Sequence, residues 1–287
     1  MEAKNILDMI IEKSASDAFV RVHSPIRLRI FSAVVTVGDR DLTISDVEGI
    51  IGGLVSETDR EMLKQKHNCE FAVCYSDRWR FRVAVFYQRN TPSLVIRKID
   101  LNMVTFDDLA LPSKVLEGFC KERRGLILVT GMTGSGKSTA IASMIEYINV
   151  NLPKHVLTIE EPVEYTFKDK RAIVTQREIG RDVRSYEEAL RQSINHSPDV
   201  IYISNIRDRE TCHAALTAAE TGVLVLSTIH SINATSTIER LVNFFPAEHH
   251  HFIFNQLSFL LKGVLSLRLL PRSDTGGLVP AYEVMTL

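Results

Sequence analysis

Residues 131–139, Gly-Met-Thr-Gly-Ser-Gly-Lys-Ser-Thr, fit the phosphate-binding motif G-x-x-x-x-G-K-[ST] at every required position. Glycines allow the tight turn that aims backbone N–H groups at phosphate oxygens. Lys137 adds a cation for the outer phosphates, and the Ser138 hydroxyl suits Mg²⁺. We therefore predict an ATP and Mg²⁺ site. The residues assigned to the nucleotide are Gly131, Thr133, Gly134, Ser135, Gly136, Lys137, Ser138 and Thr139, with Ser138 also assigned to the metal.

The flanking sequence supports this assignment. An apolar run over 125–130 indicates a buried parallel strand, and residues 140–148 carry apolar side chains at helical spacing. A strand, a glycine loop and a helix in this order place an anion at a helix N-terminus. The alternative, a glycine-rich surface turn with an exposed lysine, does not require such flanks.

Carboxylates lie at and just after the end of the next predicted strand, residues 155–161, and we assign Glu160 and Glu164 as candidate catalytic residues. A carboxylate at this strand end can orient or deprotonate the attacking water. Adjacent strand residues face opposite sides, so only one of Glu160 and Glu161 can face the phosphates directly. A solvated acidic loop is the alternative, but Pro162 ends the strand where the carboxylates fall.

Asn205 and His230 end two further predicted strands, over 200–206 and 223–229. P-loop enzymes usually have a carboxylate for Mg²⁺ or its water where Asn205 stands, and a neutral amide cannot act as a base. A histidine at a strand end beside a P-loop is suited to sensing phosphate. Both are assigned to the catalytic site.

Arg80, Arg82 and Arg97 lie on predicted strands of the N-terminal part, and the first two share a face by the strand period of two. They are either solubilising charges on an edge strand or cations that reach a nucleotide held by a neighbouring subunit. We assign them as candidate catalytic residues that act on the nucleotide of a neighbouring subunit.

Two domains are expected. Strand-like runs and two helices predict a compact α/β domain over residues 1–100, followed by a linker over 101–112. From 113 to 287, strands alternate with helices, which predicts a parallel sheet with helices on both faces. Ligands of such sheets bind outside the carboxyl ends of the strands.

The composition restricts the class of protein. With 287 residues, a formal net charge of −1 and a pI of about 6.8, nothing global favours nucleic-acid binding. The N-terminal residues do not resemble a signal peptide, and the apolar stretch 252–270 is too polar to span a bilayer and is predicted to be a packed helix. The four cysteines form no C-x-x-C pair, so we predict no zinc site.

These motifs together resemble the secretion-type hexameric ATPases, specifically the type IV pilus retraction ATPases of the PilT/PilU type. Residues 158–164 resemble the family's Asp box with Glu161 where Asp is usual, His230 falls in its His box, and Gln176-Arg177-Glu178 is a further family block. Residues 86–90 and 239–246 are more similar to the PilU branch. The resemblance covers nearly the whole chain.

The resemblance implies a PAS-like N-terminal α/β domain, a RecA-like P-loop NTPase domain over 113–287 and a homo-hexameric ring. It implies a cytoplasmic location, peripheral at the inner-membrane base of the pilus. The implied partners are a PilT-type retraction motor and the inner-membrane pilus platform protein. The four-cysteine zinc module of the related extension ATPases is absent from the sequence, and we expect the family's C-terminal helical region to be missing beyond Leu287.

One departure from the family leaves two functions open. The family has Gly-Glu-Ile/Met-Arg-Asp where this sequence has Ser204-Asn205-Ile206-Arg207-Asp208, so its glutamate is missing. The chain is either a hexameric ATPase that drives pilus retraction, or a catalytically weak nucleotide-binding ring subunit beside an active PilT-type partner. A nucleic-acid translocase with the same core has no support from the charge.

Overall fold

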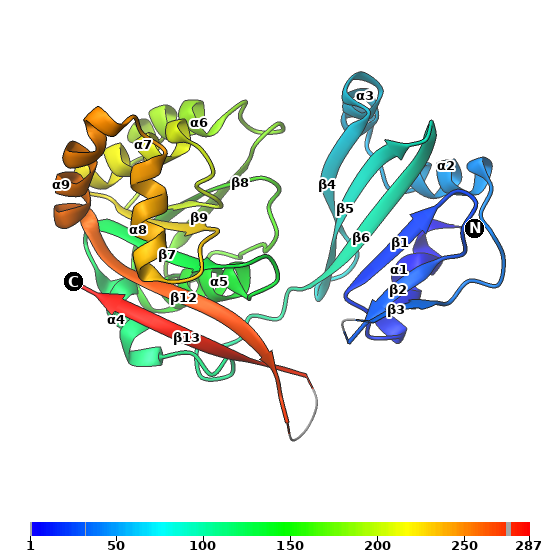
Figure 1. Cartoon of the computed structure of the whole chain (residues 1–287), viewed down its shortest axis with the longest axis horizontal. Helices are drawn as coiled ribbons and strands as arrows, with labels where there is room; N and C mark the ends of the chain where they lie inside the picture. The colour runs from blue at the N-terminus through cyan, green and yellow to red at the C-terminus, as the bar shows by residue number, and fades with distance from the viewer. Residues whose placement is uncertain (1, 32, 274–276) are drawn as a thin grey trace. The chain divides into compact units, whose positions relative to one another are not determined.

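The computed structural model describes residues 2–31, 33–273 and 277–287, which divide into two compact units, 1–102 and 103–287 (Figure 1). Each unit has its own sheet and its own apolar core. The predicted α/β fold class, a PAS-like unit followed by a RecA-like unit, is confirmed by the sheet orders given below.

The N-terminal unit has a six-stranded antiparallel sheet in the order β3-β2-β1-β6-β5-β4. Apart from the added edge strand β3, this is the strand order of a PAS-like sheet. One face of the sheet is covered by helices, and its core contains Ile6, Ile50 and Phe81. The elements are α1 (Ala3–Glu12), β1 (Asp17–Arg21), β2 (Arg27–Ile30), β3 (Ala33–Thr36), α2 (Ile44–Gly52), α3 (Glu57–Lys66), β4 (Asn68–Cys74), β5 (Trp79–Gln88) and β6 (Thr91–Asp100).

The C-terminal unit has a seven-stranded sheet in the order β13-β12-β7-β11-β10-β8-β9. All its pairs are parallel except the edge hairpin of β12 and β13. Its strands are β7 (Gly125–Gly131), β8 (His155–Glu160), β9 (Ile173–Glu178), β10 (Val200–Ile203), β11 (Leu224–Ile229), β12 (Leu261–Pro271) and β13 (Leu278–Thr286). Its helices are α4 (Ser113–Lys121), α5 (Lys137–Asn151), α6 (Tyr186–Ser193), α7 (Arg209–Glu220), α8 (Ala234–Asn243) and α9 (His250–Leu260), with 3-10 turns at Ile194–His196 and Ala247–His249.

Helices cover both faces of this sheet. On β7, Ile127 and Val129 face the cluster that α4 and α5 contribute to, whereas Leu126 and Leu128 face the cluster of α6 to α9. A strand buried on both faces needs a continuous apolar run, which explains the composition of residues 125–130. The order β12-β7-β11-β10-β8 is the RecA-like arrangement, with β11 between the strand that precedes the P-loop and the strand that ends before Asn205.

The sequence predicts a linker over residues 101–112. In the structure, this segment is largely packed on the C-terminal unit. Phe106 and Leu111 are buried in the cluster of α4 and α5, and the Ser143 hydroxyl of α5 donates to the Val104 carbonyl at 2.8 Å. The division between the two units falls after Asn102.

The prediction of a helix over residues 252–270 is wrong for the second half of this range. Helix α9 ends at Leu260, and β12 runs from Leu261 beside β7. The backbone of β12 passes so close to α4 that a Cβ at Gly263 would lie 2.1 Å from the Phe119 ring. The sequence signal against a continuous helix was Gly263, because glycine is disfavoured in a helix interior.

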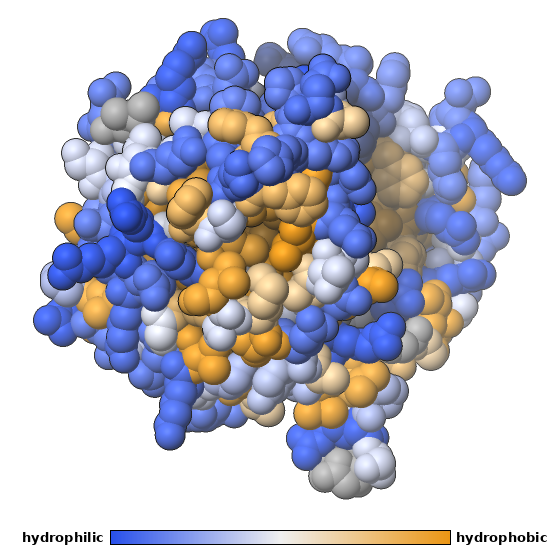
Figure 2. Space-filling model, turned by 60° about the vertical axis from the view of Figure 1, so that its left-hand side comes forward, coloured by the Kyte–Doolittle hydropathy of each residue, from blue (hydrophilic) through white to orange (hydrophobic). Residues whose placement is uncertain are grey.

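The surface carries apolar residues as well as polar ones. Helix α9 exposes Phe252, Phe254 and Phe259, the last with 78% of its surface accessible. Figure 2 shows one face of the molecule, on which apolar side chains gather around a hollow bordered by hydrophilic residues. No helix among the described residues is both long enough and apolar enough to cross a membrane.

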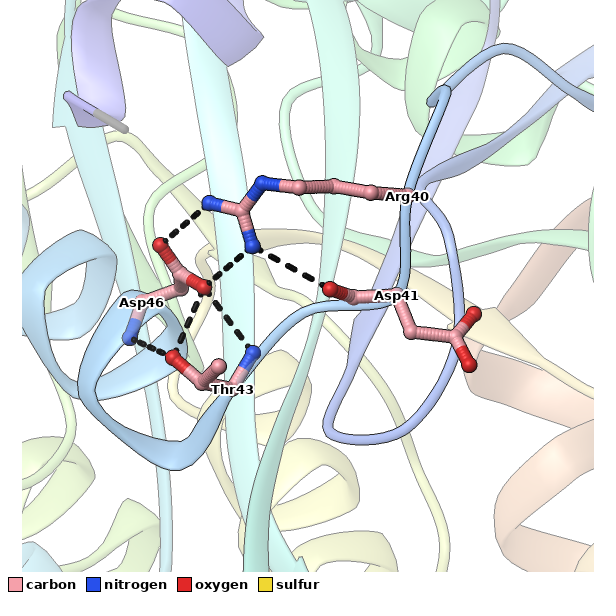
Figure 3. Close-up of polar contacts among 4 residues, drawn as sticks. All are labelled: Arg40, Asp41, Thr43 and Asp46. Atoms are coloured by element: carbon pink, nitrogen blue, oxygen red, sulfur yellow. Dashed lines mark hydrogen bonds and ion pairs between the residues drawn. The ribbon is translucent and has the colours of Figure 1, made fainter.

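Helix α2 begins with a reinforced capping box (Figure 3). The Thr43 hydroxyl accepts the Asp46 backbone N–H at 3.2 Å, and the Asp46 carboxylate accepts the Thr43 backbone N–H at 2.9 Å. Arg40 donates both terminal nitrogens to the same carboxylate at 2.8 Å. This pairing and the Thr43 bonds hold the pKa of Asp46 well below its usual range. The N-cap is therefore Thr43, and Ser45 lies in the first turn of the helix.

Replacing the observed cap tests this assignment. Thr43→Ala should lower the free energy of unfolding of the N-terminal unit by about 1 kcal/mol, because one N-terminal N–H of the helix loses its acceptor. Ser45→Ala is the matched control and should be neutral or slightly stabilising. Denaturant titrations measure both, and a larger loss for Ser45→Ala would reverse the assignment.

Candidate nucleotide site

The phosphate-binding loop connects β7 to α5 at the carboxyl edge of the parallel sheet. Gly136 is the N-cap of α5 with φ +93°, and Gly131 has φ +147°, both disfavoured for residues with a side chain. A Cβ at Gly131 would lie 2.3 Å from Ser135 Oγ and 2.4 Å from the Leu267 carbonyl oxygen. The loop can therefore pack against Ser135 and β12 in this conformation only with glycine at this position.

Lys137 is folded back over the loop. Its Nζ donates to the carbonyls of Gly131 at 2.8 Å and Met132 at 2.9 Å, and it lies 3.5 Å from His230 Nδ1. Burial lowers the pKa of Lys137, and the Glu164 carboxylate opposes that shift. Glu164 thus acts electrostatically on the cation of the P-loop.

Three hydroxyl residues of the loop differ in their surroundings. Ser135 Oγ is buried without a hydrogen-bond partner in the described chain, and Thr139 Oγ1 lies 3.1 Å from the Tyr165 hydroxyl. Ser138, in the first turn of α5, is half-buried, and its hydroxyl bonds to no described residue. A hydroxyl at this position fits a ligand of Mg²⁺. Thr133 and Gly134 are exposed at the tip of the loop.

Glu160 and Glu164 lie in different environments. Glu160 is 5% exposed and accepts from Thr158 Oγ1 at 2.7 Å and Gln176 Nε2 at 3.2 Å. Burial raises the pKa of Glu160 to about 7 in spite of these bonds. Glu164 is half-buried, and Glu161 is exposed and pairs with Arg207 at 3.0 Å. Glu164 is the carboxylate of this segment whose charge acts on Lys137.

Asn205 follows β10, and its Oδ1 is buried with no hydrogen-bond partner in the described part of the chain. The preceding Ser204 hydroxyl lies 2.7 Å from the Tyr186 hydroxyl, and the Ile206 backbone N–H donates to the Thr228 carbonyl at 2.8 Å. The backbone around Asn205 is therefore held by its neighbours, while its buried amide oxygen has an unused capacity to accept a hydrogen bond within the described chain.

His230 follows β11 and reaches the P-loop. Burial, Lys137 and Arg240 lower the pKa of His230, so the ring is neutral at pH 7. The structure therefore brings Lys137 and His230 together, with Glu164 in electrostatic range of Lys137.

Arg80, Arg82 and Arg97 lie in the N-terminal unit, on the sheet face opposite its helices, where Arg82 is paired directly with Arg97 across β5 and β6. Arg97 Nε donates to Asp17 at 2.9 Å, and Arg82 donates to Glu70 at 2.7 Å. The Arg80 guanidinium donates to Cys74 Sγ at 2.8 Å. The expectation that Arg80 and Arg82 share a face is met.

No role was predicted from sequence for the polar side chains that contact Glu160 and Val163. Thr158 and Gln176 contact Glu160, and Glu178 is 7% exposed and accepts the Val163 backbone N–H at 3.0 Å. Tyr165 was also missed. The available signal was the unusual polarity of residues 176–178 inside an α/β domain.

The fold and this loop define a P-loop protein with a RecA-like nucleotide site. A sequence profile described as Type II/IV secretion system protein matches residues 2–276. The type IV pilus ATPase PilU of Pseudomonas aeruginosa is 38% identical over 99% of this chain and 74% of its own length. PilT of the same organism, a type IV pilus retraction ATPase, is 35% identical over 99% of this chain and 82% of its own length.

A solved structure agrees with these relatives. The crystal structure of the pilus retraction motor PilT with bound ADP superposes with a TM-score of 0.89 and 42% identity, over all of this chain and 83% of that one. The chain therefore belongs to the Type II/IV secretion system family, and within it to the relatives of the pilus ATPases PilU and PilT. The resemblance inferred from the motifs is confirmed.

Glu160→Gln should remove a pH dependence of the stability of the C-terminal unit. The pKa of the buried carboxyl is about 7 against 4.5 for an ordinary one. Its proton therefore stabilises the fold fully below pH 4.5, and this contribution is lost as the pH rises through 7. Relative to the variant, the wild type should lose about 3 kcal/mol over this range, at about 1.4 kcal/mol per pKa unit. Denaturant titrations at several pH values measure the difference, and a constant difference would contradict the prediction.

Proposed function

We propose that this protein is an ATP-binding motor subunit of a type IV pilus machine that drives or assists pilus retraction, and hence twitching motility. The observation that carries the proposal is the position of the P-loop. It lies at the N-terminus of α5 beside the ends of β8, β10 and β11, which carry Glu160, Asn205 and His230. Relatives named as pilus ATPases and as a twitching motility protein support the same assignment.

ATP would bind with its phosphates along the loop from Gly131 to Thr139. Backbone N–H groups and Lys137 would hold the outer phosphates, for which Lys137 must leave the carbonyls of Gly131 and Met132. Ser138 would hold Mg²⁺, a Lewis acid that neutralises charge on the transferred phosphate. The neutral His230 ring, 3.5 Å from Lys137, is placed to respond to the presence of the phosphates.

Glu164 is the better candidate for orienting the attacking water. Its charge acts on the P-loop cation, whereas Glu160 is buried and engaged by Thr158 and Gln176. A carboxylate near the phosphates can accept the proton of the water. Glu160 would then contribute by supporting the segment rather than as the base.

The working form would be a homo-hexameric ring, with Arg80, Arg82 or Arg97 reaching the nucleotide of an adjacent subunit. Guanidinium groups suit this role because their fork of N–H donors matches phosphate oxygens. The ring would lie in the cytoplasm, peripheral to the inner membrane at the pilus base. There its partners would be a PilT-type motor and the inner-membrane platform protein.

A second function is favoured by Asn205. The strand end that should hold a carboxylate carries a neutral amide with a buried, unpartnered Oδ1 among the described residues. Such an oxygen can accept from a metal-bound water, so nucleotide binding survives, but it cannot take a proton. The chain would then be a catalytically weak ring subunit that acts beside an active PilT-type partner.

Nucleotide binding is tested first. Lys137→Ala should abolish ATP binding measured by calorimetry, because the loop loses its side-chain cation. Lys121→Ala is the control, since that lysine pairs with Glu117 on the surface of α4. Equal ATP affinity in Lys137→Ala and the wild type would exclude this site.

The ring is tested through Arg97. Arg97→Ala should lower the turnover of assembled protein at least tenfold, a small part of the about 10³-fold or more attributed to arginine fingers. ATP binding by isolated subunits should not change. Arg78→Ala serves as the control, because that residue forms an exposed pair with Asp100. A protein that remains monomeric with nucleotide at high concentration, as judged by light scattering, would argue against a ring.

Asn205→Glu decides between the two functions. Restoring a carboxylate should raise kcat about tenfold or more while the affinity for ATP changes little, as expected for an interaction made mainly in the transition state. Asn205→Gln is the matched control, because it adds the same length without the charge. If the wild type already turns over rapidly and Asn205→Glu is no faster, the weak-subunit function is excluded.

A further inference from the structure

The polar block at residues 176–178 forms one surface with the end of β8. Strands β8 and β9 pair in parallel, with Thr158 opposite Gln176 and Glu160 opposite Glu178. Because strand side chains alternate, these four lie on one face, the face that α5 covers. Their neighbour Arg177 points to the other face, where it donates to Gln192 of α6 at 2.8 Å.

Residues 161–167 rest on this polar surface and form no regular secondary structure. Gln176 makes two bonds to their backbone: its Nε2 donates to the Tyr165 carbonyl at 2.8 Å, and its Oε1 accepts the Phe167 N–H at 3.0 Å. Glu178 accepts the Val163 N–H at 3.0 Å. Side chains of β9 thus replace the backbone partners that a helix or strand would supply.

Glu160 also bonds to this segment, at Glu164. Its Oε2 accepts the Glu164 backbone N–H at 3.4 Å, while its Oε1 accepts from Gln176 at 3.2 Å. Gln176 therefore bonds directly to Tyr165 and Phe167, just after Glu164, and is linked to Glu164 itself through Glu160. Its amide is the one side chain of the four that both donates to and accepts from the segment in the bonds described.

The same segment touches the phosphate-binding loop on its other side. The Tyr165 hydroxyl lies 3.1 Å from Thr139 Oγ1, two residues after Lys137, and the Glu164 charge acts on Lys137. The segment is therefore held between β9 and α5. A shift on the β9 side would move Glu164 relative to the phosphates.

We propose that Gln176 is a positioning residue that sets the distance of Glu164 from the nucleotide, with Glu178 holding the start of the same segment. This inference rests on the proposed function for its effect on turnover, but the attachment itself is independent of turnover. Misplacement of a reacting group by about 1 Å can cost about 10²-fold in rate. Loss of Gln176 should thus act on kcat and leave ATP binding intact.

The test compares full-length wild type, Gln176→Ala and Arg177→Gln. Hydrogen exchange of the backbone amides at 163–167 should accelerate in Gln176→Ala and remain as in the wild type in Arg177→Gln, which alters a half-buried polar residue of the same strand on the other face. The kcat of Gln176→Ala should fall about 10-fold to 100-fold with little change in KM for ATP. Gln176→Glu keeps the size of the side chain and the acceptor for Phe167 but loses the donor to Tyr165, so it should show the same effects if the alanine variant folds poorly.

Amides at 163–167 that stay protected in both Gln176 variants would overturn the inference. A kcat that falls equally in Gln176→Ala and Arg177→Gln would do so as well, because the effect would then be general to the strand. If the wild type has no measurable turnover, the proposed hydrolysis fails, and the exchange experiment alone still decides whether Gln176 holds the segment.

Discussion

The parallel pairing of β7 with β11 and β12 is the constraint on which the rest of the site depends. It aligns the carboxyl ends of strands that are far apart in the sequence, so that the P-loop after β7 and His230 after β11 meet at one edge. The strand is buried on both faces, and its apolar residues join both helical layers. The edge can therefore be polar and turn sharply at Gly131 while the layers behind it supply the stability.

The carboxyl groups of this protein differ in burial and in pKa. Glu160 is buried and its pKa is raised to about 7, whereas Arg40 and the bonds with Thr43 hold the pKa of the surface residue Asp46 well below its usual range. The buried carboxyl is useful as an acceptor for backbone N–H groups because it is fixed by its hydrogen bonds. The half-buried Glu164 keeps access to Lys137. Two carboxyl groups four residues apart thus lie in distinct environments, one fixed among polar side chains and one in electrostatic range of Lys137.

The N-terminal sheet holds its arginines in ion pairs on one face. Its helix-free face places Arg29, Asp17, Arg97 and Arg82 in one row across four strands, with Asp17 almost fully buried between two guanidinium groups. Exposed ion pairs contribute little to stability. Arg29 and Arg97 both contact the buried Asp17 carboxylate through Nε.

Local patterns in the sequence determined the P-loop, the α/β class and the strands of the parallel core, because each depends on residues close in the chain. Glycine spacing, the apolar run at 125–130 and the polar block at 176–178 were all visible there. Only the tertiary structure decided that Glu164 rather than Glu160 acts on Lys137, and that β12 and not a longer helix follows Leu260. It also decided that Gln176 bonds to the segment of residues 161–167. The physical reason is that burial and the approach of distant strands set these outcomes, and neither can be derived from the spacing of residues along the chain.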